Sequence, residues 1–272
     1  MLPARVDRSV LLSALRARRL DRTLTSALPR IDPHDEQAVG PTGLPALDAR
    51  LGGGLPRGQL SEVVGPRSSG RTSLLLQIVA TATTRGEPVA VIDALDMLDV
   101  ASAAAAGVEL ARLLWIRGHV VTNPGLCRDL NQRAMEQAVK ALGLVLQAGN
   151  FGLVVLDLGD APADAVRRLP FTTWLRLQRM VEGTQTICVL AGSESMSRSS
   201  AGLSIKLQPS QDVAADAKSD TYVAADLQVR KPVRFVGRLL DGLDVDARVT
   251  RARVQGSDTV ALPLTTKVAC HV

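Results

Sequence analysis

The chain has 272 residues, of which 46% are hydrophobic and 2% aromatic, and its formal net charge is +5. This length and apolar content exclude a disordered chain and predict one large α/β domain with a core of Leu, Val and Ala plus an additional element. Three scattered cysteines without a CxxC pair exclude a disulfide framework and a zinc site, and we find neither a membrane-spanning run nor a signal peptide, so we expect a cytoplasmic protein that does not enter a membrane.

The charge is distributed unevenly along the chain. Residues 1–30 contain seven Arg and two Asp, and residues 230–253 contain seven Lys or Arg and three Asp, whereas residues 31–229 have a net charge of −4. Basic ends suit an anionic partner such as nucleic acid or an acidic protein surface. The alternative is a bias in the base composition of the genome, because 27 of the 32 basic residues are Arg.

The first predicted element is an amphipathic helix at residues 8–24. Val10, Leu11, Ala14 and Leu15 have helical spacing with arginines between them, and three later prolines indicate a linker up to residue 40. The apolar stripe either packs on the chain's own domain or docks onto a neighbouring subunit or another protein. In the second interpretation, the partner-binding residues are Leu11, Leu15, Arg18, Arg19 and Arg22.

Strand and helix patterns alternate from residue 41 to residue 208. The predicted strands are 59–64, 88–93, 113–117, 151–157 and 186–191. The predicted helices are 45–51, 71–84, 123–147 and 171–181. Strands that alternate with helices predict a mostly parallel sheet with helices on both faces.

The pattern changes after Leu203, and residues 209–272 are predicted to form a β extension with a basic tail. Three strand patterns, 203–207, 222–230 and 243–254, follow one another without helices, which predicts an antiparallel extension at one sheet edge. The basic residues of the tail either contact DNA or belong to an ordinary solvated edge strand. The candidate DNA-binding residues are Arg230, Lys231, Arg234, Arg251 and Arg253.

A phosphate-binding loop pattern, GPRSSGRT, lies between the strand that ends at Val64 and the helix that begins near Arg71. Two glycines five positions apart let backbone N–H groups surround phosphate oxygens, and the helix N-terminus adds positive charge. This pattern predicts an ATP site in which Thr72 and Asp157, at the end of an apolar strand, hold Mg²⁺. The alternative for Asp157 is a helix cap. The predicted cofactor-binding residues are Gly65, Pro66, Arg67, Ser68, Ser69, Gly70, Arg71, Thr72 and Ser73.

Arg71 departs from the pattern, which has Lys at this position. A planar guanidinium keeps the charge but not the compact shape that fits between two phosphates. We therefore expect nucleotide binding to survive more readily than fast phosphoryl transfer. Arg67 is expected to face solvent.

With these residues placed, the chain resembles the RecA recombinase core over roughly residues 40–208. The run of that family from the lead-in helix through the P-loop is resembled by TGLPALDARLGGGLPRGQLSEVVGPRSSGRTSLLLQ. Its second strand is resembled by PVAVIDALDMLD, and its Walker B strand by FGLVVLD. The motifs LLWIR and WLRLQRMVEG and the short tail look closer to the RecA-like ImuA subfamily. The resemblance implies a RecA-like P-loop core with antiparallel strands at its C-terminal edge.

The departures from recombinases bear on activity. Recombinases have a water-activating Glu where this chain has Leu95, and we expect the adjacent Asp96 to point to the opposite strand face. The place of their γ-phosphate-sensing Gln is near Ser193. The two DNA-binding loops are also short, with Arg167, Arg168 and Arg198 as their basic residues, so strand exchange is not expected.

The resemblance implies an accessory protein of DNA-damage-induced (SOS) mutagenesis and translesion synthesis in the bacterial cytoplasm, at the nucleoid. Its implied partners are an ImuB-like inactive Y-family polymerase, RecA and an error-prone replicative-type polymerase. With a degenerate P-loop, ATP and Mg²⁺ would be weakly bound or vestigial, and no catalytic residue is assigned. The alternatives are an active ATPase, with Asp96 or Glu62 as base, and a DNA-binding repair protein.

Overall fold

The computed structural model describes residues 39–119, 128–197 and 202–209 and the strand segments 235–236, 239–240, 243–252 and 261–266. All of them belong to one compact unit, Pro33–Val272. The predicted helix at residues 8–24, with Leu11, Leu15, Arg18, Arg19 and Arg22, lies outside the described residues. So does the predicted strand at 222–230.

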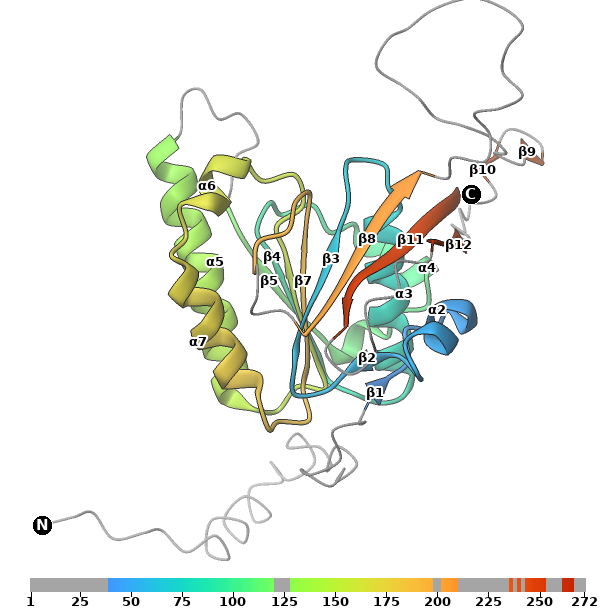
Figure 1. The fold of residues 1–272 in the computed structure, drawn as a ribbon, viewed down its shortest axis with the longest axis horizontal. Coiled ribbons are helices and arrows are strands. Elements are labelled where there is room, and N and C mark those ends of the chain that lie inside the picture. The colour runs from blue at the N-terminus through green and yellow to red at the C-terminus, as the bar shows by residue number, and fades with distance from the viewer. Residues whose placement is uncertain are drawn as a thin grey trace, which may run out of the picture. The chain divides into compact units, whose positions relative to one another are not determined.

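One large sheet carries the fold (Figure 1). Its strands are β3 (Leu60–Val64), β4 (Val89–Asp93), β5 (Leu113–Arg117), β6 (Leu153–Asp157), β7 (Ile187–Gly192), β8 (Leu203–Pro209), β11 (Leu243–Ala252) and β12 (Ala261–Thr266). Their spatial order is β12-β11-β8-β3-β7-β6-β4-β5. The six strands from β8 to β5 in this order are parallel, and β11 runs antiparallel to both β8 and β12.

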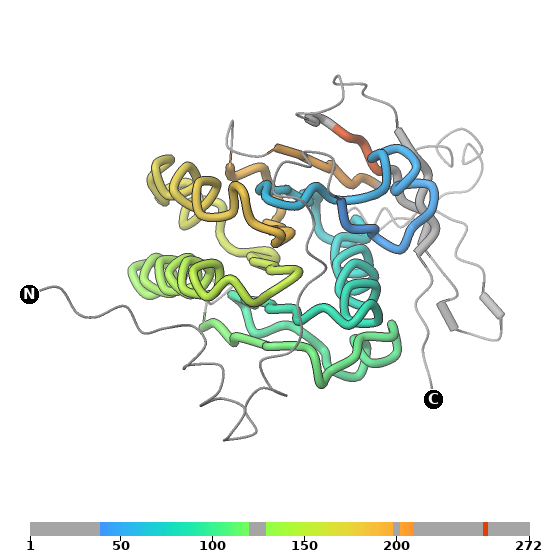
Figure 2. The backbone as a smooth tube through the Cα atoms, turned by 90° about the horizontal axis from the view of Figure 1, so that it is seen from below, coloured from blue at the N-terminus to red at the C-terminus, as the bar shows by residue number. Residues whose placement is uncertain are grey.

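Helices cover both faces of the sheet. They are α2 (Pro45–Arg50), α3 (Arg71–Thr84), α4 (Val100–Ala105), α5 (Arg128–Ala148), α6 (Ala163–Arg167) and α7 (Phe171–Val181), with a 3₁₀ turn at Leu110–Arg112. Figure 2 shows α5 and α7 beside each other on one side of the sheet and α3 on the other. No helix among the described residues is long and apolar enough to cross a membrane.

Two apolar clusters lie on the two faces of the sheet. The first joins α2, α3 and α4 to one face, and Leu74, Leu75, Ile78 and Val79 of α3 are buried there. The second joins α5, α6 and α7 to the opposite face, where Trp174 is 2% exposed. Because parallel strands are buried on both faces, their sequences read as nearly continuous apolar runs.

The predicted α/β fold class is confirmed, with a mostly parallel sheet and antiparallel strands at the C-terminal edge. One strand direction was wrong: β8 was expected in the antiparallel extension, yet it pairs in parallel with β3. Period-two alternation is the same in both pairings, so a sequence pattern cannot distinguish them. In the sheet, β3 lies between β7 and β8 and runs parallel to both.

Two small antiparallel pairs lie apart from this sheet. One joins β1 (Val39–Gly40) to β2 (Leu55–Pro56), and the other joins β9 (Phe235–Val236) to β10 (Leu239–Leu240). Neither pair was predicted, and the short α4 and α6 were also missed. The strands of these pairs have only two residues each, and α4 and α6 have one to two helical turns, so none of them shows a clear period in the sequence.

Candidate phosphate-binding site

The loop of residues 65–70 connects the end of β3 to the start of α3, at the carboxyl edge of the parallel strands. Gly65 N–H donates to Gly192 O at 3.1 Å, which ties the loop to the end of β7. A Cβ on Gly65 would collide with Ser69 Oγ and with Leu207 O. Gly70 precedes α3 with φ +82°, a left-handed conformation that favours glycine. Both glycines are therefore required by the backbone path of the loop.

The guanidinium of Arg71 is engaged by the protein itself. It is buried, and Nη1 donates to Gly65 O at 2.5 Å while Nη2 donates to Asp160 Oδ1 at 3.1 Å. The other oxygen of Asp160 lies 3.4 Å from Nε of Arg67, whose side chain is 86% exposed. Arg67 thus faces solvent as expected. One carboxylate bridges the two basic residues of the loop.

The loop retains features that fit an anionic ligand. Ser69 Oγ and Arg71 Nε are buried without a hydrogen-bond partner in the described structure. The first N–H groups of α3 have no partner within the helix and point out of its N-terminus. These donors could hold the phosphates of a nucleotide, together with the Arg71 guanidinium once it is released. The predicted ATP site is therefore chemically compatible with the residues present.

Asp157 ends β6 in the predicted metal position. Its Oδ1 accepts from Gly159 N–H at 2.8 Å, and burial raises the pKa of Asp157 above the ordinary value, opposed by that hydrogen bond and by the charge of Arg71. Asp93 is its register partner on β4. No group of three or more His, Cys, Asp or Glu side chains able to hold a metal occurs among the described residues. A Mg²⁺ ion would rely on Asp157 and the exposed Thr72 together with phosphate oxygens.

The turn after β4 holds Leu95 and Asp96. Asp93 fixes it by accepting from Leu98 N–H at 2.7 Å and from Trp115 Nε1 at 3.3 Å. The half-buried Leu95 packs against the apolar cluster of α5 and α7. No acidic side chain therefore occupies the position at which recombinases have their base.

Asp96 is placed differently from the expectation. β4 ends at Asp93, so Asp96 is not on a strand; it lies in the turn with φ +57°. Arg117 binds it at 2.6 and 2.7 Å through two nitrogens and lowers the pKa of Asp96 by this hydrogen bonding. The Arg117 guanidinium also lies 4.8 Å from the Trp115 ring centroid. Trp115 is only half-buried because β5 is an edge strand.

Glu62, the other candidate base, is completely buried in β3. Its Oε1 accepts from the backbone N–H groups of Met196 at 2.9 Å and Ser197 at 2.6 Å. Its Oε2 accepts from the hydroxyls of Ser195 at 2.7 Å and Ser204 at 3.2 Å. A carboxylate with four donors holds the segment after β7 in place and is not available to activate water.

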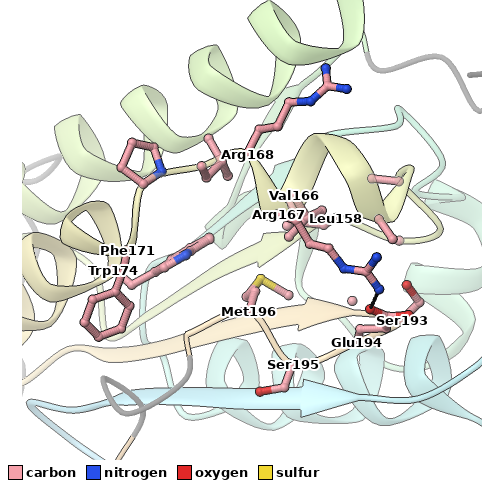
Figure 3. Close-up of a pocket in the computed structure, with 16 residues that line it drawn as sticks. Leu158, Val166, Arg167, Arg168, Phe171, Trp174, Ser193, Glu194, Ser195 and Met196 are labelled. Atoms are coloured by element: carbon pink, nitrogen blue, oxygen red, sulfur yellow. Dashed lines mark hydrogen bonds and ion pairs between the residues drawn. The ribbon is translucent and has the colours of Figure 1, made fainter. Parts of the chain in front are cut away.

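A cavity of about 400 Å³ opens beside this segment (Figure 3). Its wall includes Leu158, Val166, Phe171, Trp174 and Met196. At its mouth, Arg167 Nη2 donates to Glu194 Oε2 at 2.7 Å, between α6 and the segment after β7, while Figure 3 shows Arg168 pointing away from this pair. This ion pair joins the C-terminal end of α6 to the segment after β7. Arg198 lies outside the described residues.

The basic tail is described only in part. Arg230, Lys231, Arg234 and Arg253 lie outside the described residues, and Arg251 falls in β11. Arg248 of β11 is exposed opposite the exposed Lys206 of β8. The pairing register between β11 and β8 shifts between Val249 and Arg251, which interrupts the regular alternation of side chains there.

Sequence reasoning missed Asp160. It stands three residues beyond the apolar strand of β6 in no recognisable motif, and only the loop after β6 brings it to Arg67 and Arg71. It also treated Glu62 as a potential base, because an acidic residue within an apolar strand has no visible partner in the sequence. Its partners Ser195, Met196 and Ser197 are more than 130 positions away.

A parallel sheet with a glycine loop between β3 and α3 defines a P-loop α/β protein, and comparison with known proteins agrees. Residues 27–162 match the RecA N-terminal domain. The chain is 32% identical to Protein RecA of Clavibacter michiganensis subsp. michiganensis over 232 residues, 80% of this chain and 58% of that protein. It is 30% identical to Protein RecA of Leifsonia xyli subsp. xyli over 263 residues, which are 86% of this chain and 67% of that protein. It is 39% identical to Protein RecA of Bordetella pertussis over 125 residues, which are 46% of this chain and 31% of that protein.

The chain belongs to the RecA family. It spans 58% and 67% of the length of the first two relatives that it matches.

Proposed function

We propose that this protein is a RecA-fold adaptor of DNA-damage-induced mutagenesis, with lost or weak ATP hydrolysis. It would act at the nucleoid, where it links an ImuB-like inactive Y-family polymerase, RecA and an error-prone replicative-type polymerase in translesion synthesis. This is the role of the ImuA subfamily, which the motifs around residues 113–117 and 174–183 resemble. Docking would use the amphipathic helix predicted at residues 8–24.

One observation supports lost or weak hydrolysis: the residues that hydrolysis would need are either replaced by other residue types or already bound by other groups of the protein. Arg71 is bound to Gly65 O and Asp160, and the base position holds Leu95. The two carboxylates considered as substitutes, Asp96 and Glu62, are bound by Arg117 and by the segment after β7. Removing a general base alone costs about 10²- to 10⁴-fold in rate.

The hydrolysis test compares the purified full chain with Arg71→Ala. The adaptor proposal expects phosphate release from ATP and Mg²⁺ to stay at background for both proteins, so the substitution changes nothing. Rapid release that Arg71→Ala abolishes would overturn this part and favour the alternative of an active ATPase. The observation that favours this alternative is that Asp157, the predicted Walker B residue, ends β6.

The docking test uses the immobilised full chain to capture purified ImuB-like protein and RecA, each alone and together. The proposal expects capture of both without ATP. Failure to capture either one removes the adaptor role. A DNA-binding repair protein, the remaining alternative, would bind single-stranded DNA with an affinity that falls steeply with salt.

A further inference from the structure

The basic residues of the phosphate-binding loop are held by a carboxylate from a different part of the chain. Asp160 follows β6 by three residues, and its two oxygens reach Arg71 Nη2 at 3.1 Å and Arg67 Nε at 3.4 Å. A carboxylate resembles a phosphate in charge and in the geometry of its acceptor oxygens, and guanidinium groups bind both in the same way. Asp160 therefore makes the kind of contact that a phosphate would make.

We propose that Asp160 is an internal competitor of phosphate, which keeps the loop closed until a polyphosphate displaces it from Arg71. This deepens the assignment of the loop as a weak nucleotide site and concerns regulation of that same site. The ligand class is a nucleoside di- or triphosphate, recognised through its phosphate chain.

The burial of the participants favours competition over a purely structural ion pair. The Arg71 side chain is 8% exposed, whereas the Asp160 side chain is 36% exposed. Asp160 can therefore turn into solvent when displaced, while Arg71 remains inside the loop. A buried guanidinium without its carboxylate is an unfavourable state, so it should attract another anion.

The closed state also leaves other donors unused. Nη1 of Arg71 binds Gly65 O, the first carbonyl of the loop, while Nε of Arg71 and Oγ of Ser69 remain buried without partners in the described part of the chain. A phosphate would pair these groups, but the Asp160 carboxylate does not reach them. The Asp160 carboxylate therefore replaces only part of the contacts that a phosphate would make. A polyphosphate at sufficient concentration can displace it.

The experiment measures binding of inorganic tripolyphosphate and of ATP, each with and without Mg²⁺, by calorimetry on the full chain. Asp160→Asn removes the charge and keeps the shape, so affinity for both ligands should rise about tenfold, because a charge-assisted contact no longer competes. Asp164→Asn is the matched control: it removes one charge from the exposed start of α6, and its affinity should equal that of the wild type. Asp160→Glu, which keeps the charge, should also bind like the wild type.

Two further outcomes would overturn the proposal. If Asp160→Asn weakens binding only when Mg²⁺ is present, Asp160 assists the metal together with Asp157 and does not compete with phosphate. If Asp160→Asn binds neither ligand, or binds them no more tightly than Asp164→Asn does, the ion pair is structural only. None of these results depends on hydrolysis or partner capture, so the adaptor proposal can fail while this one stands.

Discussion

A guanidinium and an ammonium group carry the same charge but differ in how many partners they can hold at once. The planar fork of Arg71 reaches a backbone carbonyl with one nitrogen and a carboxylate with another, and both contacts lie within the protein. A Lys at this position would present a single flexible point charge. With Arg at this position, some of the donors that would bind phosphate already have acceptors within the protein.

Restoring ATP hydrolysis should require substitutions at both Arg71 and Leu95. We expect the double variant Arg71→Lys/Leu95→Glu to release phosphate from ATP at least about tenfold faster than the wild type, because a positioned base contributes about 10²- to 10⁴-fold when its geometry is good. Each single variant should stay near background. Arg71→Lys/Leu95→Gln is the matched control, since it introduces a polar side chain that cannot accept the proton. Equal rates for the Glu and Gln double variants would contradict the prediction.

The raised pKa of Asp157 predicts a pH-dependent cost in stability. A carboxyl whose pKa is higher in the folded than in the unfolded chain favours folding while protonated, and this contribution is lost as the pH rises through the folded pKa. Asp157→Asn avoids the burial of a charge and can still accept from Gly159 N–H. The difference in free energy of unfolding between Asp157→Asn and the wild type should therefore shift in favour of the variant, by on the order of 1 kcal/mol, as the pH rises from 4 to 8.

Urea unfolding at several pH values measures this difference for Asp157. Asp164→Asn, which removes a charge from the exposed start of α6, is the control variant. A constant difference between Asp157→Asn and the wild type over the whole range would show that burial does not perturb Asp157.

At the scale of elements, Glu62 joins β3 to the segment that follows β7. Glu62→Gln replaces one acceptor oxygen by an NH₂ group that faces existing donors, so we expect the free energy of unfolding to fall by about 2–4 kcal/mol. Amide hydrogen exchange at residues 193–197 should accelerate more than in α3. The control is Glu109→Gln, which loses an exposed ion pair with Arg112 and should change stability by less than about 0.5 kcal/mol. Equal effects of the two variants would refute the role of Glu62.

The elements that the sequence predicted best are those with long, uniform patterns. The helices at 71–84 and 171–181 have the predicted bounds, and the apolar strands that end at Asp93 and Asp157 differ by one or two residues at their starts. The partner of β8 was not predictable, because a strand pattern contains no information about its neighbour. α6 was missed because its five residues follow a proline in what looked like a loop.

The same limit applied to the site. The glycine loop could be read from spacing alone, since its function depends on consecutive backbone positions. The contacts from Asp160 to Arg71 and from Glu62 to the segment after β7 join positions 89 to 135 residues apart. Only the order of strands β3, β7 and β6 in the sheet brings them together.

At the scale of the whole molecule, the basic ends and the acidic middle predict that different surfaces serve different partners. The described residues all belong to the unit Pro33–Val272, and the predicted docking helix at 8–24 precedes that unit in the sequence. If this helix docks onto a partner, as we propose, substitutions in it should leave the stability of the sheet unchanged. Capture and stability can then be compared in the full chain.

We predict that Leu11→Asp/Leu15→Asp abolishes capture of the ImuB-like protein or RecA, because two charges interrupt the apolar stripe, while the melting temperature stays within about 2 °C of the wild type. The matched variant Arg230→Ala/Lys231→Ala/Arg234→Ala removes charge from the other basic end and should retain capture. Pull-down from purified components and a thermal melt of each variant give both readings. If only the tail variant loses capture, the docking surface lies at the C-terminal end. The helix at 8–24 would then be assigned to packing on its own domain.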